Sequence, residues 1–123
     1  MLPKKRRLTT ELLDEVMTSG RIFYSPILSL KAIKVKYNSS TKDKKNNLEK
    51  SRFAVVAAKK YFKTAVLRNK MRRRTYTALA ATIAHIDDNF HCILMLKPSA
   101  IELDPSELKE AIHEIFVKSQ IIT

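Results

Sequence analysis

The sequence predicts an α+β fold in which helices pack on a small mixed sheet. Apolar residues recur at helical spacing in three segments, and they alternate or run together in three others. The segments follow in the order helix, strand, strand, helix, strand, helix. Parallel strands on either side of the central helix would make it a crossover. The chain has 123 residues, 45% of them hydrophobic. We therefore assign residues 1–123 to one domain with a modest core.

The N-terminal part is predicted to contain a basic arm, a helix and an extended segment. The arm covers residues 1–8. The helix is expected at about Thr10–Ser19, where one face carries Leu12, Leu13, Val16 and Met17. Gly20 suits the helix end, and as the only glycine of the chain it argues against a Gly-rich phosphate loop. Ile22–Tyr37 is predicted to be extended, with a phase change after Ala32 that indicates a bulge or a strong twist.

The middle part is predicted to contain a flexible polar loop at residues 38–50, a strand and the long helix. The strand covers Arg52–Ala58 and is apolar after its first residue. The helix is expected from Lys63 or Thr64 to about Ile86. Its inward stripe comprises Leu67, Met71, Thr75, Ala78, Leu79, Thr82, Ile83 and Ile86. Its opposite side carries Asn69, Arg72, Arg73 and Tyr76.

The C-terminal part is predicted to contain a turn at Asp87–Asn89, a strand at Phe90–Leu96 and a last helix. Asp104 can cap that helix, Pro105 suits its first turn, and Glu107 completes a capping box. Its apolar face comprises Leu108, Ala111, Ile112, Ile115 and Phe116.

The charge of the chain is unevenly distributed. Residues 1–76 carry 21 basic and 5 acidic side chains, whereas residues 77–123 carry 3 basic and 7 acidic ones. The 18 residues 59–76 alone contain eight cations and no acid. Apolar residues at helical spacing within that run indicate a folded helix and not a disordered basic tail. We infer that one face meets a polyanion, which is RNA, DNA or an anionic membrane surface.

Several other functions are disfavoured. The apolar runs are too short to cross a bilayer, and we expect neither a signal peptide nor membrane association. Cys92 is expected to be a buried thiol in a reducing, cytoplasmic compartment. The three histidines, His85, His91 and His113, show no spacing typical of metal ligands. No triad, cysteine nucleophile or carboxylate pair suited to catalysis stands out. We therefore expect no catalytic residue and no metal site in the protein.

Five segments together resemble the bacterial ribonuclease P protein subunit over nearly the whole chain. The main one is Ala65–Arg73, AVLRNKMRR, which is similar to the family's arginine-asparagine-arginine signature and its following basic pair. The others are Leu2–Leu8, Val16–Gly20, Tyr24–Leu30 and Ser51–Lys60. Their combination in this order is specific, although each segment alone is weak.

The resemblance implies a two-layer α/β sandwich with a left-handed β-α-β crossover. General handedness statistics would predict the opposite hand. It also implies a protein that binds a catalytic RNA and the 5′ leader of precursor tRNA. The protein is expected to be a monomer in a one-to-one complex with that RNA. In this family the RNA holds the magnesium ions and hydrolyses the leader. The leader lies in a cleft between the sheet and the first helix.

The chain departs from the family pattern at four positions. Lys70 replaces a second arginine of the signature, so a bidentate phosphate contact becomes a point charge. Tyr76 stands where a basic residue is common. Leu13 and Met17 occupy positions that are often phenylalanine, which weakens base stacking on the leader.

The expected RNA contacts come from the long helix, the strand before it and the arm. They are Arg68, Asn69, Lys70, Arg72, Arg73, Arg74, Lys59, Lys60, Arg52, Lys4, Lys5, Arg6 and Arg7. The alternative for each cation is ordinary solvation at the surface. For Asn69, the alternatives are exposure to solvent, a bridge to phosphate or hydrated metal, and orientation of neighbouring arginines.

The expected leader cleft comprises Leu13, Met17, Tyr24, Leu28, Leu30 and Phe53. For Leu28, Leu30 and Phe53, a place in the core is the favoured alternative. Three other functions stay open: a structural, ribosomal-type RNA-binding protein, a protein-only nuclease, and a basic helix that acts on DNA or lipid.

Overall fold

The computed structural model describes residues 6–34, 51–86 and 90–120, and all statements below concern these residues. Its elements are α1 (Thr10–Ser19), β1 (Arg21–Tyr24), β2 (Leu28–Lys34), β3 (Arg52–Val56), α2 (Ala65–Ile83), β4 (Phe90–Leu96), the 3₁₀ helix η3 (Pro98–Glu102) and α3 (Pro105–Lys118). The expectations for Lys4, Lys5, the loop at 38–50 and the turn at 87–89 lie outside the described residues.

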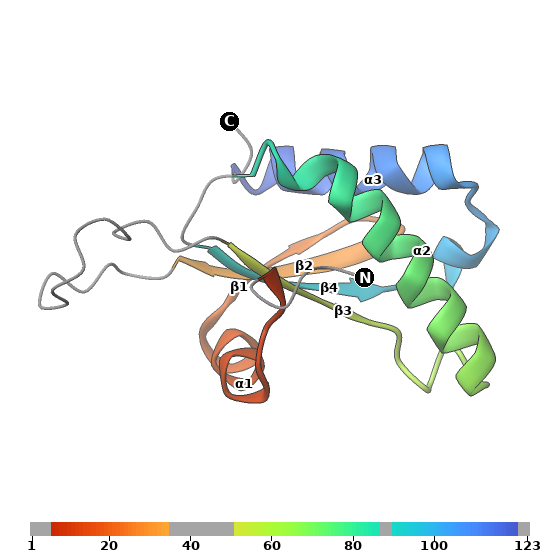
Figure 1. Ribbon diagram of the computed structural model, residues 1–123, viewed down its shortest axis with the longest axis horizontal. Coiled ribbons are helices and arrows are strands. Elements are labelled where there is room, and N and C mark those ends of the chain that lie inside the picture. The colour runs from red at the N-terminus through yellow and green to blue at the C-terminus, as the bar shows by residue number, and fades with distance from the viewer. Residues whose placement is uncertain (1–5, 35–50, 87–89, 121–123) are drawn as a thin grey trace, which may run out of the picture.

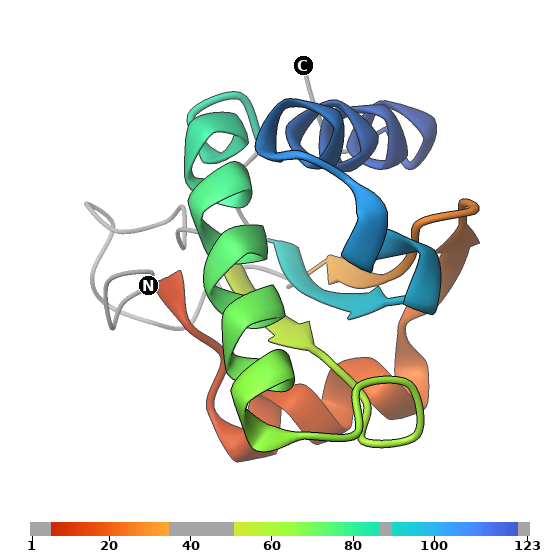
Figure 2. The ribbon, with the colours of Figure 1, turned by 90° about the vertical axis from the view of Figure 1, so that its right-hand side faces the viewer.

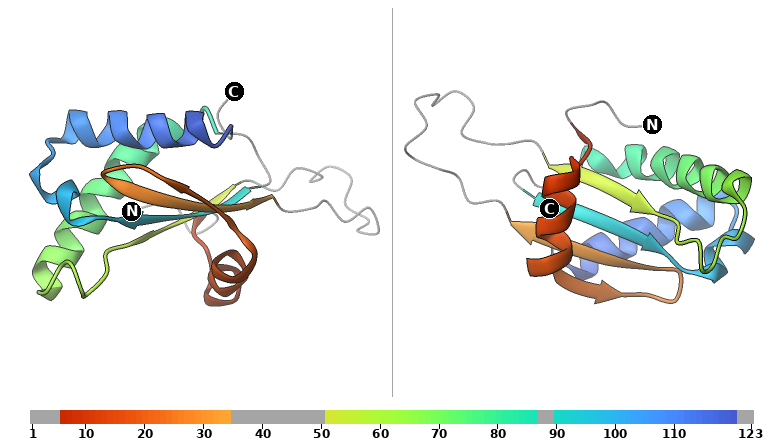
Figure 3. Two further views of the ribbon diagram at one scale, coloured as in Figure 1. Left: turned by 180° about the vertical axis from the view of Figure 1, so that it is seen from behind. Right: turned by 90° about the horizontal axis from the view of Figure 1, so that it is seen from below.

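The four strands form one mixed sheet in the order β1-β2-β4-β3. β1 and β2 are antiparallel, as are β2 and β4, whereas β3 and β4 are parallel and joined through α2. Viewed from below the sheet, β3 and β4 point the same way while α2 lies on the far side (Figure 3, right). This arrangement is a left-handed crossover, which confirms the hand implied by the resemblance.

The helices cover the two faces of the sheet unequally. α2 and α3 lie on one face and α1 lies on the other (Figure 1). From below, α1 crosses only one end of the strands, and the other end of that face is left without a helix (Figure 3, right). The C-terminal half of α2 packs beside α3, and its N-terminal half continues along the β3 edge (Figure 2).

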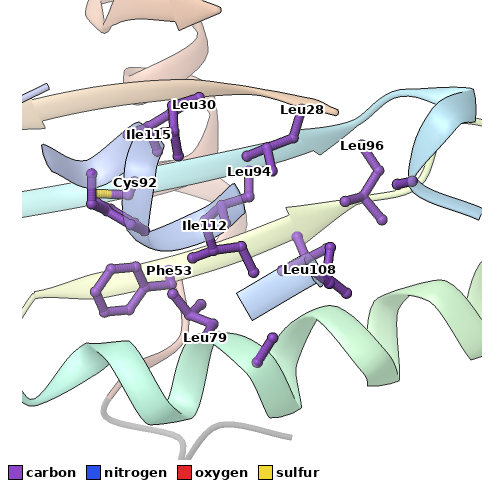
Figure 4. Packing of buried hydrophobic residues seen from close by; sticks show 14 of the residues in the cluster. Leu28, Leu30, Phe53, Leu79, Cys92, Leu94, Leu96, Leu108, Ile112 and Ile115 are labelled. Atoms are coloured by element: carbon purple, nitrogen blue, oxygen red, sulfur yellow. The ribbon is translucent and has the colours of Figure 1, made fainter. Parts of the chain in front are cut away.

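The main core lies between the sheet and the helices α2 and α3. Its buried residues include Leu28, Leu30, Phe53, Leu94, Leu108 and Ile112 (Figure 4). Phe116 belongs to the same core. The rings of Phe53 and Phe116 meet edge to face, with centroids 6.2 Å apart. The assignment of Leu28, Leu30 and Phe53 to a leader cleft is therefore wrong, because all three are 0% exposed on the face opposite α1. The alternative, that they belong to the core, is confirmed.

The segment Ile22–Tyr37 is not one continuous strand. β1 and β2 form a hairpin around Ser25, Pro26 and Ile27. The Ser25 Oγ accepts hydrogen bonds from the backbone N–H groups of Ile27 and Leu28, at 3.2 and 3.1 Å. The Ser25 N–H donates to the carbonyl of Leu28 at 3.0 Å. Serine and proline here close a turn, which apolar alternation alone does not reveal.

The helix ends largely match the sequence predictions. Thr64 caps α2, and its Oγ1 accepts from the Leu67 N–H at 3.1 Å. Asp104 and Glu107 form the predicted capping box of α3. α2 ends at Ile83, three residues before the predicted end, but Ile86 is still buried. Gly20 ends α1, and a Cβ at this position would lie 2.5 Å from the carbonyl oxygen of Val16.

Candidate nucleic-acid interface

The rotation of α2 about its axis is set by its buried stripe. Met71, Thr75, Ala78, Leu79 and Thr82 are buried against the sheet and α3. This packing leaves the side chains of Asn69, Lys70, Arg72 and Arg73 exposed on the outer surface. A stiff helix therefore presents these groups in fixed register, as the sequence predicts.

A hollow beside the β3 edge brings together part of the predicted RNA-binding set. It has a volume of about 470 Å³ and is lined by Val55, Asn69, Arg72, Arg73 and Tyr76. The guanidinium of Arg72 donates from Nη2 to Oδ1 of Asn69. Asn69 therefore orients Arg72, which is one of the alternatives that the sequence left open.

Tyr76 has a structural role at this hollow. Its hydroxyl oxygen accepts a hydrogen bond from the backbone N–H of Val55 at 3.2 Å. β3 is the last strand of the sheet, so this N–H has no neighbouring strand on that side. Tyr76 thus satisfies an edge donor that would otherwise face the hollow. Tyr76 is therefore half-buried against the edge of the sheet, whereas Asn69 and Arg72 are exposed.

Two arginines of the basic run are partly committed to the protein itself. The Arg68 Nη1 donates to the carbonyl of Phe62 at 2.9 Å and holds the segment before α2. The Arg74 Nη2 lies 3.4 Å from the carbonyl oxygen of Leu103, at the long limit for a hydrogen bond. Both side chains are half-buried, whereas Lys70, Arg72 and Arg73 are exposed. The basic run therefore contains two kinds of cation. Arg68 and Arg74 contact backbone carbonyls of the protein, whereas Lys70, Arg72 and Arg73 face outward.

The electrostatics of α2 favour an anionic partner. The first turn of the helix contains no acidic residue. Arg68 lies at the end of the first turn, near the positive end of the helix dipole, where a cation is disfavoured. The cations also repel one another at i, i+4 spacing by a few tenths of a kcal/mol per pair. Within the described part of the chain, no ion pair joins Arg72 or Arg73 to a carboxylate. A bound phosphate would relieve both effects.

The remaining predicted cations lie at the two ends of β3. Arg52 donates from Nη1 to the carbonyl of Arg7 at 3.2 Å, and Arg6 donates to the carbonyl of Ser51 at the same distance. Arg7 also forms a parallel bridge with Phe53, so the arm is attached to the β3 edge. Beyond the other end, Lys59 and Lys60 are exposed in the turn before α2.

The sheet face beside α1 carries the other candidate surface. Met17 is 44% exposed and Tyr24 58% exposed, while Leu13 is half-buried. The Lys97 Nζ lies 5.7 Å from the centroid of the Tyr24 ring, an aromatic–cation pair at the surface.

The uncovered end of that face has a floor that the sequence analysis missed. Met95 pairs with Val56 and Ser29, and Ser29 pairs with Tyr24, so these four share one row across the strands. Val56 and Met95 are half-buried. Successive side chains of a strand point to opposite faces of the sheet. Val56 follows the buried Val55 and Met95 follows the buried Leu94, so the alternation places Val56 and Met95 on the face away from the main core.

The hollow beside the β3 edge offers few ligand atoms of the kind that magnesium prefers. The hollow offers one amide oxygen, Oδ1 of Asn69, and it already accepts from Arg72. Magnesium binds mainly through carboxylates, phosphates and water. Among residues 6–34, 51–86 and 90–120, no group of three His, Cys, Asp or Glu side chains is arranged to hold a metal. The same ranges include no helix that is long and apolar enough to cross a membrane.

The fold and this surface define a class: small α+β proteins that present a cation-rich crossover helix to a polyanion. Comparison with protein families identifies the member of that class. A family model described as Ribonuclease P matches residues 2–120, so the chain belongs to the ribonuclease P protein family.

Curated relatives and solved structures agree with that membership. The ribonuclease P protein component of Microcystis aeruginosa is 29% identical over 72 residues, which is 58% of this chain and 60% of the relative. That of Synechococcus elongatus is 30% identical over 77 residues, which is 62% of this chain and 63% of the relative. The aligned part of this chain thus spans less than two thirds of these relatives.

Two solved structures share the fold at low sequence identity. A mutant of the RNase P protein of Staphylococcus aureus, described as defective in mRNA degradation, has a TM-score of 0.78 at 15% identity and covers 97% of this chain and 92% of its own. The RNase P protein of Thermotoga maritima has a TM-score of 0.69 at 16% identity, with 89% and 94% covered.

Proposed function

We propose that this chain is the protein subunit of a ribonuclease P ribonucleoprotein, which removes the 5′ leader of precursor tRNA. The observation that carries the proposal is the outward set Asn69, Arg72 and Arg73, held on a stiff helix without an ion pair to a carboxylate among the described residues. In a member of this family, such a set suits the phosphates of a catalytic RNA.

The proposed mechanism is electrostatic. The cations of α2, with Lys59, Lys60 and the arm residues Arg6 and Arg7, lower the phosphate repulsion between the catalytic RNA and its substrate. The RNA subunit performs the hydrolysis and holds the magnesium. This division is supported by the donor set on α2, which offers guanidinium groups and one amide. We place this one-to-one assembly in the cytoplasm.

The leader is proposed to lie on the sheet face beside α1, at the end that α1 leaves uncovered. Met17, Tyr24, Val56 and Met95 provide a largely apolar surface there, which suits unstacked bases. Tyr24 is the only aromatic ring in this set, so we expect it to stack on a leader base.

Cleavage assays with and without the cognate catalytic RNA test the proposal. The protein alone, with magnesium and precursor tRNA, should be inert. The catalytic RNA at low magnesium should remove the leader faster when the protein is added. Normal RNA binding without stimulation would instead favour a structural RNA-binding protein. Cleavage by the protein alone would favour a protein nuclease.

A further inference from the structure

A second hollow lies on the seam between α2 and α3, away from the β3 edge. It has a volume of about 290 Å³. It is lined by four small residues and three cations: Thr77, Ala78, Ala81 and Pro105, and Arg73, Arg74 and Lys109. We refer to the small residues as its floor and to the cations as its rim. We call it the α2–α3 groove. Arg73 and Arg74 are among the predicted RNA contacts, whereas Lys109 has no predicted function.

The groove is continuous with the surface already described. Arg73 lines both the α2–α3 groove and the hollow that contains Asn69 and Arg72. An RNA strand bound in the first hollow can therefore contact Arg73, which also lines the α2–α3 groove. Cationic surface thus extends from the β3 edge over α2 to the first turns of α3.

The chemistry of the groove is that of a nucleotide site. Three cations surround a small apolar floor, so phosphate and base can be bound at once. Lys109 is exposed, and within the described ranges it forms no ion pair with a carboxylate. The volume lies at the small end of the usual range for ligand pockets, roughly 300–1,000 Å³, which suits one nucleotide and not a longer segment.

The neighbouring carboxylates limit where the phosphate can lie. Glu110 lines the adjoining hollow with His85 and His113, and Ala81 and Lys109 line both hollows. Asp104 and Glu107 are occupied with each other in the capping box. The phosphate should therefore lie at the Arg73–Arg74–Lys109 end, away from Glu110.

We propose that the α2–α3 groove binds one unpaired nucleotide of the RNA subunit, with its base on the floor and its phosphate on the rim. This inference rests on the proposed function. The RNA subunit is favoured over the leader because the two surfaces lie on opposite faces of the sheet. The proposed leader surface is on the face that carries α1, and the groove is on the helix layer of α2 and α3 (Figure 1).

Affinity for the RNA subunit provides the first test. Lys109→Glu should weaken binding by about tenfold and lower the salt slope by about 0.7–0.9, which corresponds to one phosphate contact. Lys34→Glu is the control, because it makes the same charge change at an exposed lysine outside the groove, and the affinity should change less than for Lys109→Glu. Equal affinities of the wild type and Lys109→Glu would overturn the inference.

A second variant changes the shape of the groove without changing its charge. Ala81 is exposed on α2 and forms part of the floor, so Ala81→Leu should fold normally and fill the groove. Weaker binding of the RNA subunit at an unchanged unfolding midpoint supports the proposal. Wild-type affinity with the groove filled contradicts it.

Cross-linking identifies the RNA that occupies the groove. Cys92 is fully buried, so Ser106→Cys provides a single accessible thiol beside the groove for a photoreactive label. Val117→Cys, at the other end of α3, is the control. The Ser106 label should react with an unpaired nucleotide of the RNA subunit, and reaction only with precursor tRNA would contradict the inference. Failure of the proposed function would look different, since the wild-type protein would then neither bind the RNA subunit nor stimulate cleavage.

Discussion

At the scale of single residues, the hydrogen bond between Asn69 and Arg72 explains why an amide lies within a run of cations. Arginine loses side-chain entropy when it is fixed on a phosphate, and a preformed contact lowers that cost. Oδ1 of Asn69 accepts from one Nη2–H of Arg72, and the other N–H groups of the Arg72 guanidinium stay available to a ligand. Asn69 is therefore a positioning residue for Arg72.

A double-mutant cycle tests this coupling. Arg72→Ala and Asn69→Ala should each weaken binding of the RNA subunit, by roughly 1.5–3 kcal/mol for the charged contact of Arg72 and by less for Asn69. The double variant should lose little more than Arg72→Ala alone, because Asn69 acts through Arg72. Additive losses would show that Asn69 contacts the RNA independently.

Cys92 is a residue whose burial has a measurable consequence. Burial disfavours the thiolate and raises the pKa of Cys92 far above its ordinary value of 9.0. Above pH 9 the unfolded chain releases this proton and the folded chain keeps it. Stability should therefore fall with rising pH, by up to about 1.4 kcal/mol per pH unit. Urea unfolding from pH 8 to 10.5 should show a smaller decline for Cys92→Ala, and equal declines would contradict this reasoning.

At the scale of elements, apolar periodicity predicted most of the fold. The helix at Thr10–Ser19 and the strand at Phe90–Leu96 have the predicted bounds, since the first has one clear apolar face and the second one clear apolar run. The hairpin at Ser25 was missed because a side-chain hydrogen bond, and not hydrophobicity, turns the chain there. The left-handed crossover follows from no local pattern, and only the resemblance predicted it.

The candidate site was less predictable than the fold. The helical spacing grouped Asn69, Arg72 and Arg73 correctly on one side. It could not show that Arg68 and Arg74 have backbone partners on other segments, because these contacts depend on tertiary packing. In a short apolar run, the sequence does not show which side chains point to which face of the sheet. Phe53 was therefore assigned to the cleft, whereas Val56 of the same strand was not.

Tyr76 links α2 to the edge strand, and its removal tests that contact. Tyr76→Phe leaves the Val55 N–H without its acceptor and should lower the free energy of unfolding by about 1 kcal/mol. Tyr61→Phe is a suitable control, because Tyr61 is 40% exposed. Equal urea midpoints for the two variants would show that the Tyr76 hydroxyl contributes nothing to stability.

The capping box of α3 offers a second test at this scale. Asp104→Ala removes the acceptor of the Glu107 N–H and should cost about 1 kcal/mol of stability. Ser106→Ala, two residues further on and outside the box, should have a smaller effect. A thermal unfolding midpoint for Asp104→Ala equal to that of the wild type would contradict the role of the cap.

At the scale of the whole molecule, charge and topology act together. The left-handed crossover places the cation-rich helix along the β3 edge, and the arm is attached to the same edge. Among the described residues, the exposed cations Lys70, Arg72 and Arg73 therefore lie on the side of the molecule that carries α2, whereas α1 lies on the opposite face of the sheet (Figure 1). The helix α2 and the proposed leader surface therefore face different sides of the molecule.

The salt dependence of binding to the RNA subunit tests the central claim most directly. Arg72→Ala/Arg73→Ala should lower the slope of log Kd against log salt by about 1.4–1.8, the value for two phosphate contacts. Lys34→Ala/Lys118→Ala removes the same charge elsewhere and should leave the slope near that of the wild type. A slope unchanged by loss of Arg72 and Arg73 would show that α2 does not bind the RNA.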